Sequence, residues 1–127
     1  MVTLNKKILV IEDDAMISSM YKTKFAADGF AVAIAGDGEA GLKLARQKKP
    51  DIIMLDVILP RLDGFSVLEE LKKDSATKDI PVIMLTNLGT EEDKVKGEKL
   101  GAVDYLVKAS LTPGQVSQKI KTALNIQ

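Results

Sequence analysis

A set of polar residues that could do chemistry follows short apolar runs of the sequence. In chain order they are Glu12, Asp13, Asp14, Asp56, Thr86 and Lys108. Carboxylates that lie close together repel one another, so such a group has raised pKa values or binds a cation. The sequence contains no Cys and no His. A metal ion bound here would therefore have oxygen ligands, and with two or three carboxylates Mg²⁺ fits best.

A Mg²⁺ ion beside a carboxylate, a hydroxyl and an ammonium group indicates phosphoryl chemistry. Phosphoryl transfer depends mainly on positioning and on charge stabilisation at oxygens, which Mg²⁺, Thr86 and Lys108 could each contact. Asp56 could act as the nucleophile and form an acyl phosphate. Each residue alone also has a structural explanation, and Asp14 could serve only as a helix cap. Those explanations do not account for the convergence of all these residues.

The apolar runs before these residues are expected to form a parallel sheet. They cover residues 8–11, 30–35, 52–55, 82–85 and 103–107. Each run is continuous rather than alternating, which indicates strands buried on both faces. Ligands of such sheets bind beyond the carboxyl ends of the strands, so the polar residues should lie on one rim.

Helical patterns fill the intervals between the runs. The order predicts an α/β fold, a doubly wound (βα)₅ five-stranded parallel sheet with helices on both faces. The helix at 91–100 carries acids first and lysines later, as the helix dipole favours. The last helix has the clearest beginning, because Thr112 and Gln115 match a capping box. The expected buried faces are Ile17, Met20, Tyr21 and Phe25; then Phe65, Leu68 and either Leu71 or Lys72; and last Val116, Ile120, Ala123 and Leu124.

The composition excludes several classes of protein. The chain has 127 residues, which fits one domain, and its formal net charge is zero. It has no basic stripe for nucleic acid and no apolar run near the roughly 20 residues of a membrane helix. Its start does not resemble a signal peptide. We therefore expect a cytoplasmic protein that binds neither nucleic acid nor membrane directly.

The spacing of the polar residues resembles that of the receiver domains of two-component response regulators. The matching segments are the acids after the first run, D-x-x-x-P-x-x-D-G from Asp56 to Gly64, Thr86, and G-A-x-D-Y-L-x-K from Gly101 to Lys108. Each motif alone is weak, but together they are highly specific and span nearly the whole chain. The resemblance implies a single receiver domain over residues 1–127 with the flavodoxin-like strand order 2-1-3-4-5.

The resemblance also implies how the rim binds phosphate and metal. Asp56 would accept a phosphoryl group from a histidine kinase or a histidine phosphotransfer protein. Asp13, Asp56 and the backbone carbonyl of Ile58 would bind Mg²⁺, with Asp14 reaching the ion directly or through water. Thr86 would contact the phosphoryl group together with Lys108.

The same resemblance implies a signalling switch rather than an enzyme with external substrates, although the protein would catalyse its own phosphorylation and dephosphorylation. Thr86 and Tyr105 would form the switch, in which the hydroxyl moves toward the phosphate and the ring turns inward behind it. The changed surface would comprise the helix at 91–100, the strand at 103–107 and the last helix. It would act on a downstream output protein or domain, with the chain a monomer or a phosphorylation-dependent dimer.

Two positions depart from the usual receiver pattern. Ala109 follows Lys108 where a proline is usual, so the bond between them is either a strained cis bond or a trans bond that aims Lys108 differently. Asn87 stands after Thr86 in place of a smaller residue. Ile58 and Leu88 are apolar and, with Asn87, are expected to shield an acyl phosphate from water.

Four alternative functions compete with the switch. Residues 36–41 read GDGEAG, which matches a dinucleotide fingerprint, but Asp37 and Glu39 would put negative charge beside the pyrophosphate. A flavodoxin-like FMN site would need a hydroxyl-rich loop in place of the first acids. A carboxylate-nucleophile phosphohydrolase would want a second Asp at position 58, which is Ile. The intact set of polar residues argues against a receiver fold used only as a scaffold.

Overall fold

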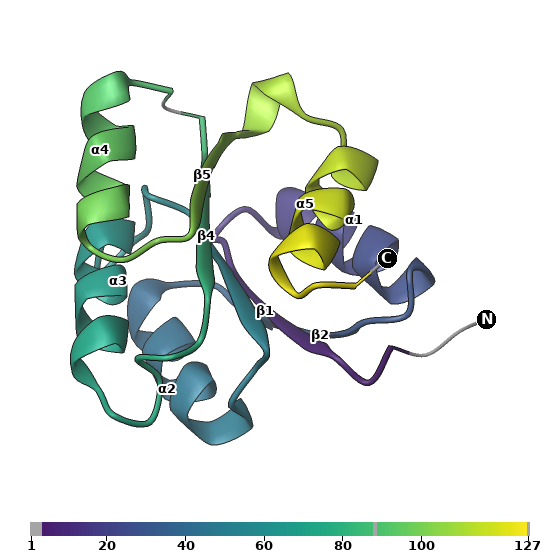
Figure 1. The fold of residues 1–127 in the computed structure, drawn as a ribbon, viewed down its shortest axis with the longest axis horizontal. Coiled ribbons are helices and arrows are strands. Elements are labelled where there is room, and N and C mark those ends of the chain that lie inside the picture. Colours follow the sequence, from purple (N-terminus) through teal and green to yellow (C-terminus); the bar gives the residue numbers. More distant parts are fainter. Residues whose placement is uncertain (1–3, 88, 127) are drawn as a thin grey trace.

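The computed structural model describes residues 4–87 and 89–126, and strands alternate with helices along the chain (Figure 1). The elements are β1 (Lys7–Ile11), α1 (Ala15–Ala27), β2 (Ala31–Ala35), α2 (Gly38–Lys48), β3 (Ile52–Leu55), α3 (Gly64–Lys73), β4 (Val82–Thr86), α4 (Glu91–Lys99), β5 (Asp104–Val107), the short 3₁₀ helix η1 (Lys108–Ser110) and α5 (Pro113–Ala123). The strands are all parallel and lie in the order β2-β1-β3-β4-β5. The predicted fold class and strand order are confirmed.

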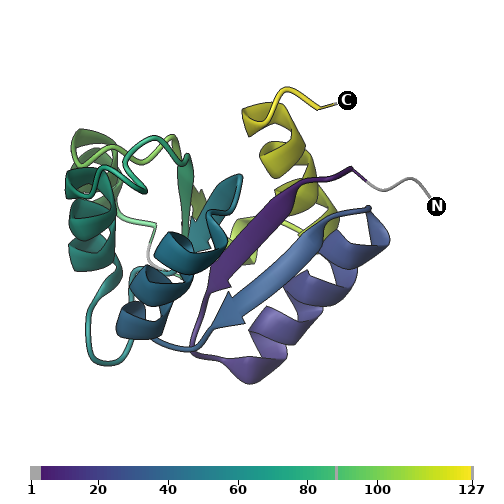
Figure 2. The ribbon, with the colours of Figure 1, turned by 90° about the horizontal axis from the view of Figure 1, so that it is seen from below.

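The sheet lies between two layers of helices, with α2, α3 and α4 on one face and α1 and α5 on the other (Figure 1). Figure 2 shows β1 and β2 side by side and pointing the same way. Successive strand residues point to opposite faces, so β1 contributes Leu9 to the cluster under α2 and α3 and Val10 to the cluster under α1 and α5. Both clusters are apolar, which explains why the strands read as continuous hydrophobic runs.

Side-chain caps fix where the α-helices begin. The capping residues of α1 to α5 are Asp14, Asp37, Asp63, Thr90 and Thr112, each of which accepts a backbone N–H of the first turn. The capping box of Thr112 and Gln115 is present as predicted, with reciprocal hydrogen bonds of 3.1 and 2.8 Å. Helix starts were therefore well encoded by local sequence.

Two predicted buried faces were wrong in part. In α1, Met20 is 42% exposed. Ser18 is buried in its place, on the same helix as the buried Tyr21 and Phe25. In α5, Ala123 is exposed while Ser117 is buried. The hydroxyl of Ser117 donates to the carboxylate of Asp28 at 2.6 Å, so a polar contact ties α5 to the end of α1. The apolar pattern could not predict it, because small polar residues fit a helix interface when they are hydrogen-bonded.

The GDGEAG segment has a structural role. Asp37 caps α2 and accepts the N–H of Ala40 at 2.8 Å. A Cβ at Gly41 would lie 2.6 Å from the Cδ1 atom of Ile11, so glycine lets α2 pack closely on β1. These contacts explain the pattern without a nucleotide. Within the described part of the chain, no helix is long and apolar enough to cross a membrane.

Candidate functional site

The parallel register places the candidate residues at one rim of the sheet. Ile11 pairs with Leu55, so the residues that follow them, Glu12 and Asp56, lie next to each other. The backbone N–H of Asp56 still bonds to the carbonyl of Ile11 at 3.1 Å, which continues the ladder by one residue. On the other side Thr86 ends β4 and Lys108 follows β5.

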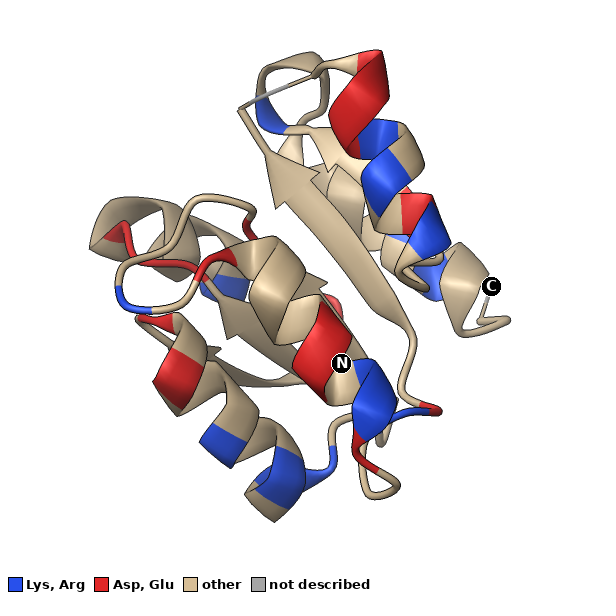
Figure 3. Cartoon of the chain, turned by 90° about the vertical axis from the view of Figure 1, so that its left-hand side faces the viewer, with Lys and Arg blue, Asp and Glu red and all other residues tan. Residues whose placement is uncertain are grey.

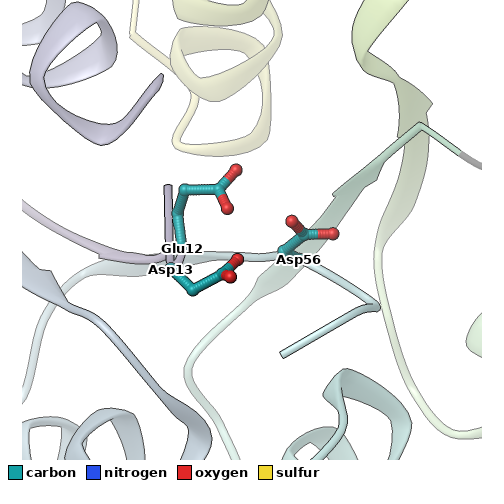
Figure 4. A group of neighbouring side chains, drawn as sticks. All are labelled: Glu12, Asp13 and Asp56. Carbon is teal, nitrogen blue, oxygen red and sulfur yellow. The ribbon is translucent and has the colours of Figure 1, made fainter. Parts of the chain in front are cut away.

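One ammonium group holds two carboxylates at the centre of this rim. The Nζ atom of Lys108 donates to the Oδ2 atom of Asp56 at 2.8 Å and also to the Oε1 atom of Glu12. Glu12, Asp13 and Asp56 each offer a carboxylate oxygen, and these oxygens lie within 4.8 Å of one another (Figure 4). Such an all-oxygen group of ligands matches the preference of Mg²⁺.

The charged groups of this cluster are largely buried, which strengthens the electrostatic interactions between them. Glu12 is 5% exposed and Asp56 is 8% exposed. Burial raises the pKa of Glu12 to about 7, the Lys108 hydrogen bond opposes that rise, and the negative charge of Asp56 adds to it. Burial disfavours the charged ammonium of Lys108, but its hydrogen bonds to Asp56 and Glu12 outweigh that effect and raise its pKa. Lys108 is therefore held in its charged form.

Glu12 stands in the acidic group at the place where Asp14 was expected. The Oδ1 atom of Asp14 accepts the N–H groups of Met16 and Ile17 at 2.9 and 3.1 Å and so caps α1. Its own N–H donates to Glu12 at 3.2 Å. The sequence did contain the signal for Glu12, because Glu12 follows the end of its strand directly, as Asp56 does. Metal binding by Asp14 stays a prediction.

The loop after β3 is fitted closely around Asp56. A Cβ at Gly64 would lie 2.1 Å from the carbonyl oxygen of Asp56, so only glycine permits this return of the chain. The N–H of Gly64 donates to the carbonyl of Val57 at 2.8 Å, and the N–H of Ile58 donates to the Oδ1 atom of Asp56 at 3.3 Å. The loop thus orients the Asp56 carboxylate through the N–H of Ile58. The side chain of Ile58 points to solvent and is 59% exposed.

A pocket of about 210 Å³ opens over the rim and is lined by Asp56, Thr86, Lys108, Asn87 and Ile58 among others. Thr86 is fully buried at its edge. The sequence left two possibilities for the bond before residue 109, and that bond is trans. Lys108 nevertheless reaches Asp56, so a proline at the next position is not needed for this contact.

The pocket also bears on the predicted shield over an acyl phosphate. Asn87 and Ile58 both line the pocket, as the prediction requires. Leu88, the third member, lies outside the described residues. The shielding effect itself stays a prediction.

Tyr105 lies behind the rim, under α4. Its ring is 7% exposed and belongs to the cluster on the α2–α4 face. Burial, and then the negative charges of Asp93 and Asp56, raise the pKa of its hydroxyl. The ring therefore lies inside the protein and within the electrostatic reach of Asp56.

Comparisons with known proteins identify sequences similar to this chain. The family model described as "Response regulator receiver domain" matches residues 8–121. The "DNA-binding dual master transcriptional regulator RpaA" of Synechocystis is 48% identical over 102 residues, which cover 80% of this chain and 42% of that protein. The "alkaline phosphatase synthesis transcriptional regulatory protein PhoP" of Bacillus subtilis is 41% identical over 121 residues, which cover 95% and 49%. The chain spans about half the length of these relatives.

Solved structures show the same fold. The receiver domain of the Francisella response regulator 1452 superposes with a TM-score of 0.85 at 36% identity, covering 93% of this chain and 95% of that one. The chemotaxis protein CheY4 of Vibrio cholerae gives a TM-score of 0.86 at 29% identity, covering 92% and 97%. Both similarities run over nearly the full length of the compared chains.

Proposed function

Because the chain belongs to the response regulator receiver domain family, we propose that it is a Mg²⁺-dependent phosphoacceptor whose modified residue is Asp56. The observation that carries this proposal is the buried carboxylate of Asp56, held by Lys108 at 2.8 Å beside the acids Glu12 and Asp13. A histidine kinase or a histidine phosphotransfer protein would supply the phosphoryl group. The receiver domain would comprise residues 1–127.

The residues of the rim fit a Mg²⁺ ion. Asp13, Asp56 and the carbonyl of Ile58 are the proposed ligands, and the position of Glu12 in the acidic group makes it a better fourth candidate than Asp14. Asp14 would then act through water or only as a cap. When bound, the ion would neutralise negative charge on the acids and on the phosphoryl oxygens.

Each side chain of the rim has a separate role in the proposed phosphoryl transfer. An oxygen of Asp56 attacks the phosphorus of a phosphohistidine, the P–N bond breaks, and the imidazole keeps the electron pair. Lys108 already donates to Asp56 and can contact an oxygen of the incoming group. Thr86, at the pocket edge, can donate its hydroxyl to another oxygen. The loop that ends at Gly64 keeps the nucleophile in place.

The proposed output is a change in the surface of α4, β5 and α5, with Thr86 and Tyr105 as the switch. Tyr105 is buried in the apolar cluster under α4, so a change in its contacts would reach the proposed output surface. The partner would be a downstream output protein or domain, without direct binding of nucleic acid or membrane by these residues. A cytoplasmic location, and a monomer that dimerises at most on phosphorylation, remain predictions.

Intact mass after treatment with acetyl phosphate and Mg²⁺ tests this function. The parent should gain one phosphoryl group, and Asp56→Asn should not. The matched control is Asp79→Asn, which changes an exposed carboxylate outside the rim. This variant should still gain the phosphoryl group. A gain that persists in Asp56→Asn would show that another residue is modified, and no gain in the parent would favour a scaffold.

Metal binding is tested by thermal melts with and without Mg²⁺. A ligand that binds only the native state raises its melting temperature. Asp13→Ala should reduce that rise, and without metal it should be as stable as the parent or more so, because repulsion between the acids is relieved. A parent whose melting temperature is unchanged across a millimolar titration would contradict a Mg²⁺ site.

A further inference from the structure

An open groove separates α3 from α4 on the face opposite α1 and α5. Its volume is about 520 Å³, and residues of both helices line it. Figure 3 shows this face, with acidic residues in the first turn of α4 and lysines in its last turn. The buried contacts of α4 are instead with the sheet, where Gly97 packs on Tyr105 and Met84. We therefore expect contacts across the groove to determine the position of α4 relative to α3.

Lys96 makes such a contact. Its Nζ atom lies 4.5 Å from the centre of the Phe65 ring, within the range of a cation–π interaction. Phe65 is 8% exposed and fixed in the core, whereas the Lys96 side chain comes from the exposed face of α4. The charge of Lys96 also acts on Asp63: burial works to raise the pKa of Asp63, but hydrogen bonds from Ser66 and the Lys96 charge contribute to lowering it.

Phe65 belongs to the part of α3 that is fitted to Asp56. It follows Gly64, whose Cα faces the carbonyl of Asp56 so closely that a Cβ would lie 2.1 Å from that oxygen. The N–H of Gly64 is also bonded to Val57, the residue after Asp56. A short chain of contacts thus runs from Asp56 through the start of α3 to Lys96 on α4.

We propose that Lys96 is a positioning residue: its contact with Phe65 holds α4 against α3 across the groove and couples the position of α4 to the state of Asp56. The inference rests on the proposed function, because α4 belongs to the proposed output surface. The contact stabilises the arrangement of α4 described here, so its loss shifts the balance between this arrangement and another. An exposed cation–π pair is worth enough to shift that balance about threefold.

The test replaces Lys96 by Met, which keeps the length and helix preference of the side chain but removes the charge. Lys99→Met is the matched control, because Lys99 also lies in the last turn of α4 and lines the same groove. Amide hydrogen exchange of the unmodified protein measures the hold on α4. Titration with beryllofluoride and Mg²⁺, a stable mimic of the phosphoryl group, measures the coupling to Asp56.

We expect α4 amides of Lys96→Met to exchange faster than those of Lys99→Met, and the affinity of Lys96→Met for beryllofluoride to differ about threefold from that of Lys99→Met. A cycle with Phe65→Leu should show that the two effects are not additive, because either change removes the same contact. Equal behaviour of the Lys96 and Lys99 variants, or full additivity in the cycle, would overturn the proposal.

Failure of the proposed function has a different signature. A parent that does not bind beryllofluoride at all would refute the phosphoacceptor and, with it, the coupling to Asp56. The exchange measurement needs no ligand, so it still decides whether Lys96 holds α4 against α3.

Discussion

Helices α4 and α5 flank the same strand, β5, and are held in very different ways. In α5, Val116 and Ile120 are fully buried and Ser117 is 1% exposed. In α4, Gly97 is the one described residue that is buried, and Val95 is 39% exposed. The two helices lie on opposite faces of the sheet (Figure 1). One face of β5 is therefore closed by apolar packing and the other by a helix with few buried side chains.

The stability of α4 comes largely from local features. Thr90 caps its start by accepting the N–H of Asp93 at 3.2 Å, and its acidic first turn and basic last turn complement the helix dipole. Such effects are each worth less than the burial of a large apolar side chain. The difference between the helices indicates that α4 can open without unfolding the rest of the domain, as elements that move must do.

The largest expected effect compares one apolar truncation in each helix. Ile120→Ala should lower the free energy of unfolding by about 2–4 kcal/mol, because it leaves a cavity in the core. Val95→Ala should lower it by less than about 1 kcal/mol, because Val95 is partly exposed. Urea unfolding monitored by circular dichroism measures both. Equal losses would mean that α4 is packed as firmly as α5.

A second prediction uses pH to separate the two helices in the metal-free protein. The pKa of Glu12 is about 7 in the folded protein against an ordinary 4.5. The folded state binds this proton more tightly, so the stability from Glu12 is complete below pH 4.5 and is lost as the pH rises through about 7. The loss should be on the order of 1–3 kcal/mol.

Hydrogen exchange at pH 5 and pH 7, corrected for intrinsic rates, shows which amides follow this loss. Amides of α5 exchange by global unfolding and should lose protection, whereas those of α4 open locally and should not. Glu12→Gln removes the titrating group and should abolish the effect in α5. Parallel changes in both helices of the parent would contradict independent opening.

The helix caps give a smaller contrast. Thr112→Ala breaks the capping box of α5 and should cost about 1 kcal/mol of global stability. Thr90→Ala removes the cap of α4 and should speed exchange within α4, with only a few tenths of a kcal/mol lost globally. Thermal melts and exchange on both variants measure these effects. A global loss from Thr90→Ala as large as that from Thr112→Ala would argue for one cooperative unit.

The smallest effect is expected at Gly97. Alanine improves helix propensity by about 1 kcal/mol. Its Cβ, however, would lie 3.3 Å from a ring carbon of Tyr105 and 3.4 Å from the sulfur of Met84, so both must shift slightly. We expect Gly97→Ala to change stability by less than about 0.5 kcal/mol while moving the ring signals of Tyr105 in NMR spectra. A large loss of stability would show that the Tyr105 site cannot adjust.

The sequence predicted those parts of the molecule that depend on local or periodic signals. The strands, the caps of α1 and α5 and the rim of Asp56, Thr86 and Lys108 all follow from short patterns, and the sheet register then brings the rim together. The polar contact of Ser117 with Asp28 could not be predicted, because its partners are far apart in the sequence. The place of Glu12 in the acidic group was missed for another reason: Glu12 and Asp14 are both acids, and only the sheet register and the cap of α1 distinguish them.

The hydrogen bond between Ser117 and Asp28 joins residues 89 positions apart. By contrast, α2 and α3 are consecutive helices that pack on each other. A growing chain on the ribosome can therefore assemble the α2–α3 side while α5 is still unmade. Until α5 arrives, α1 alone covers the apolar cluster of the other face, to which Val10 and Phe25 belong. The last helix of the domain to be synthesised is thus also the one that completes the cover of this apolar cluster and so protects the domain from aggregation.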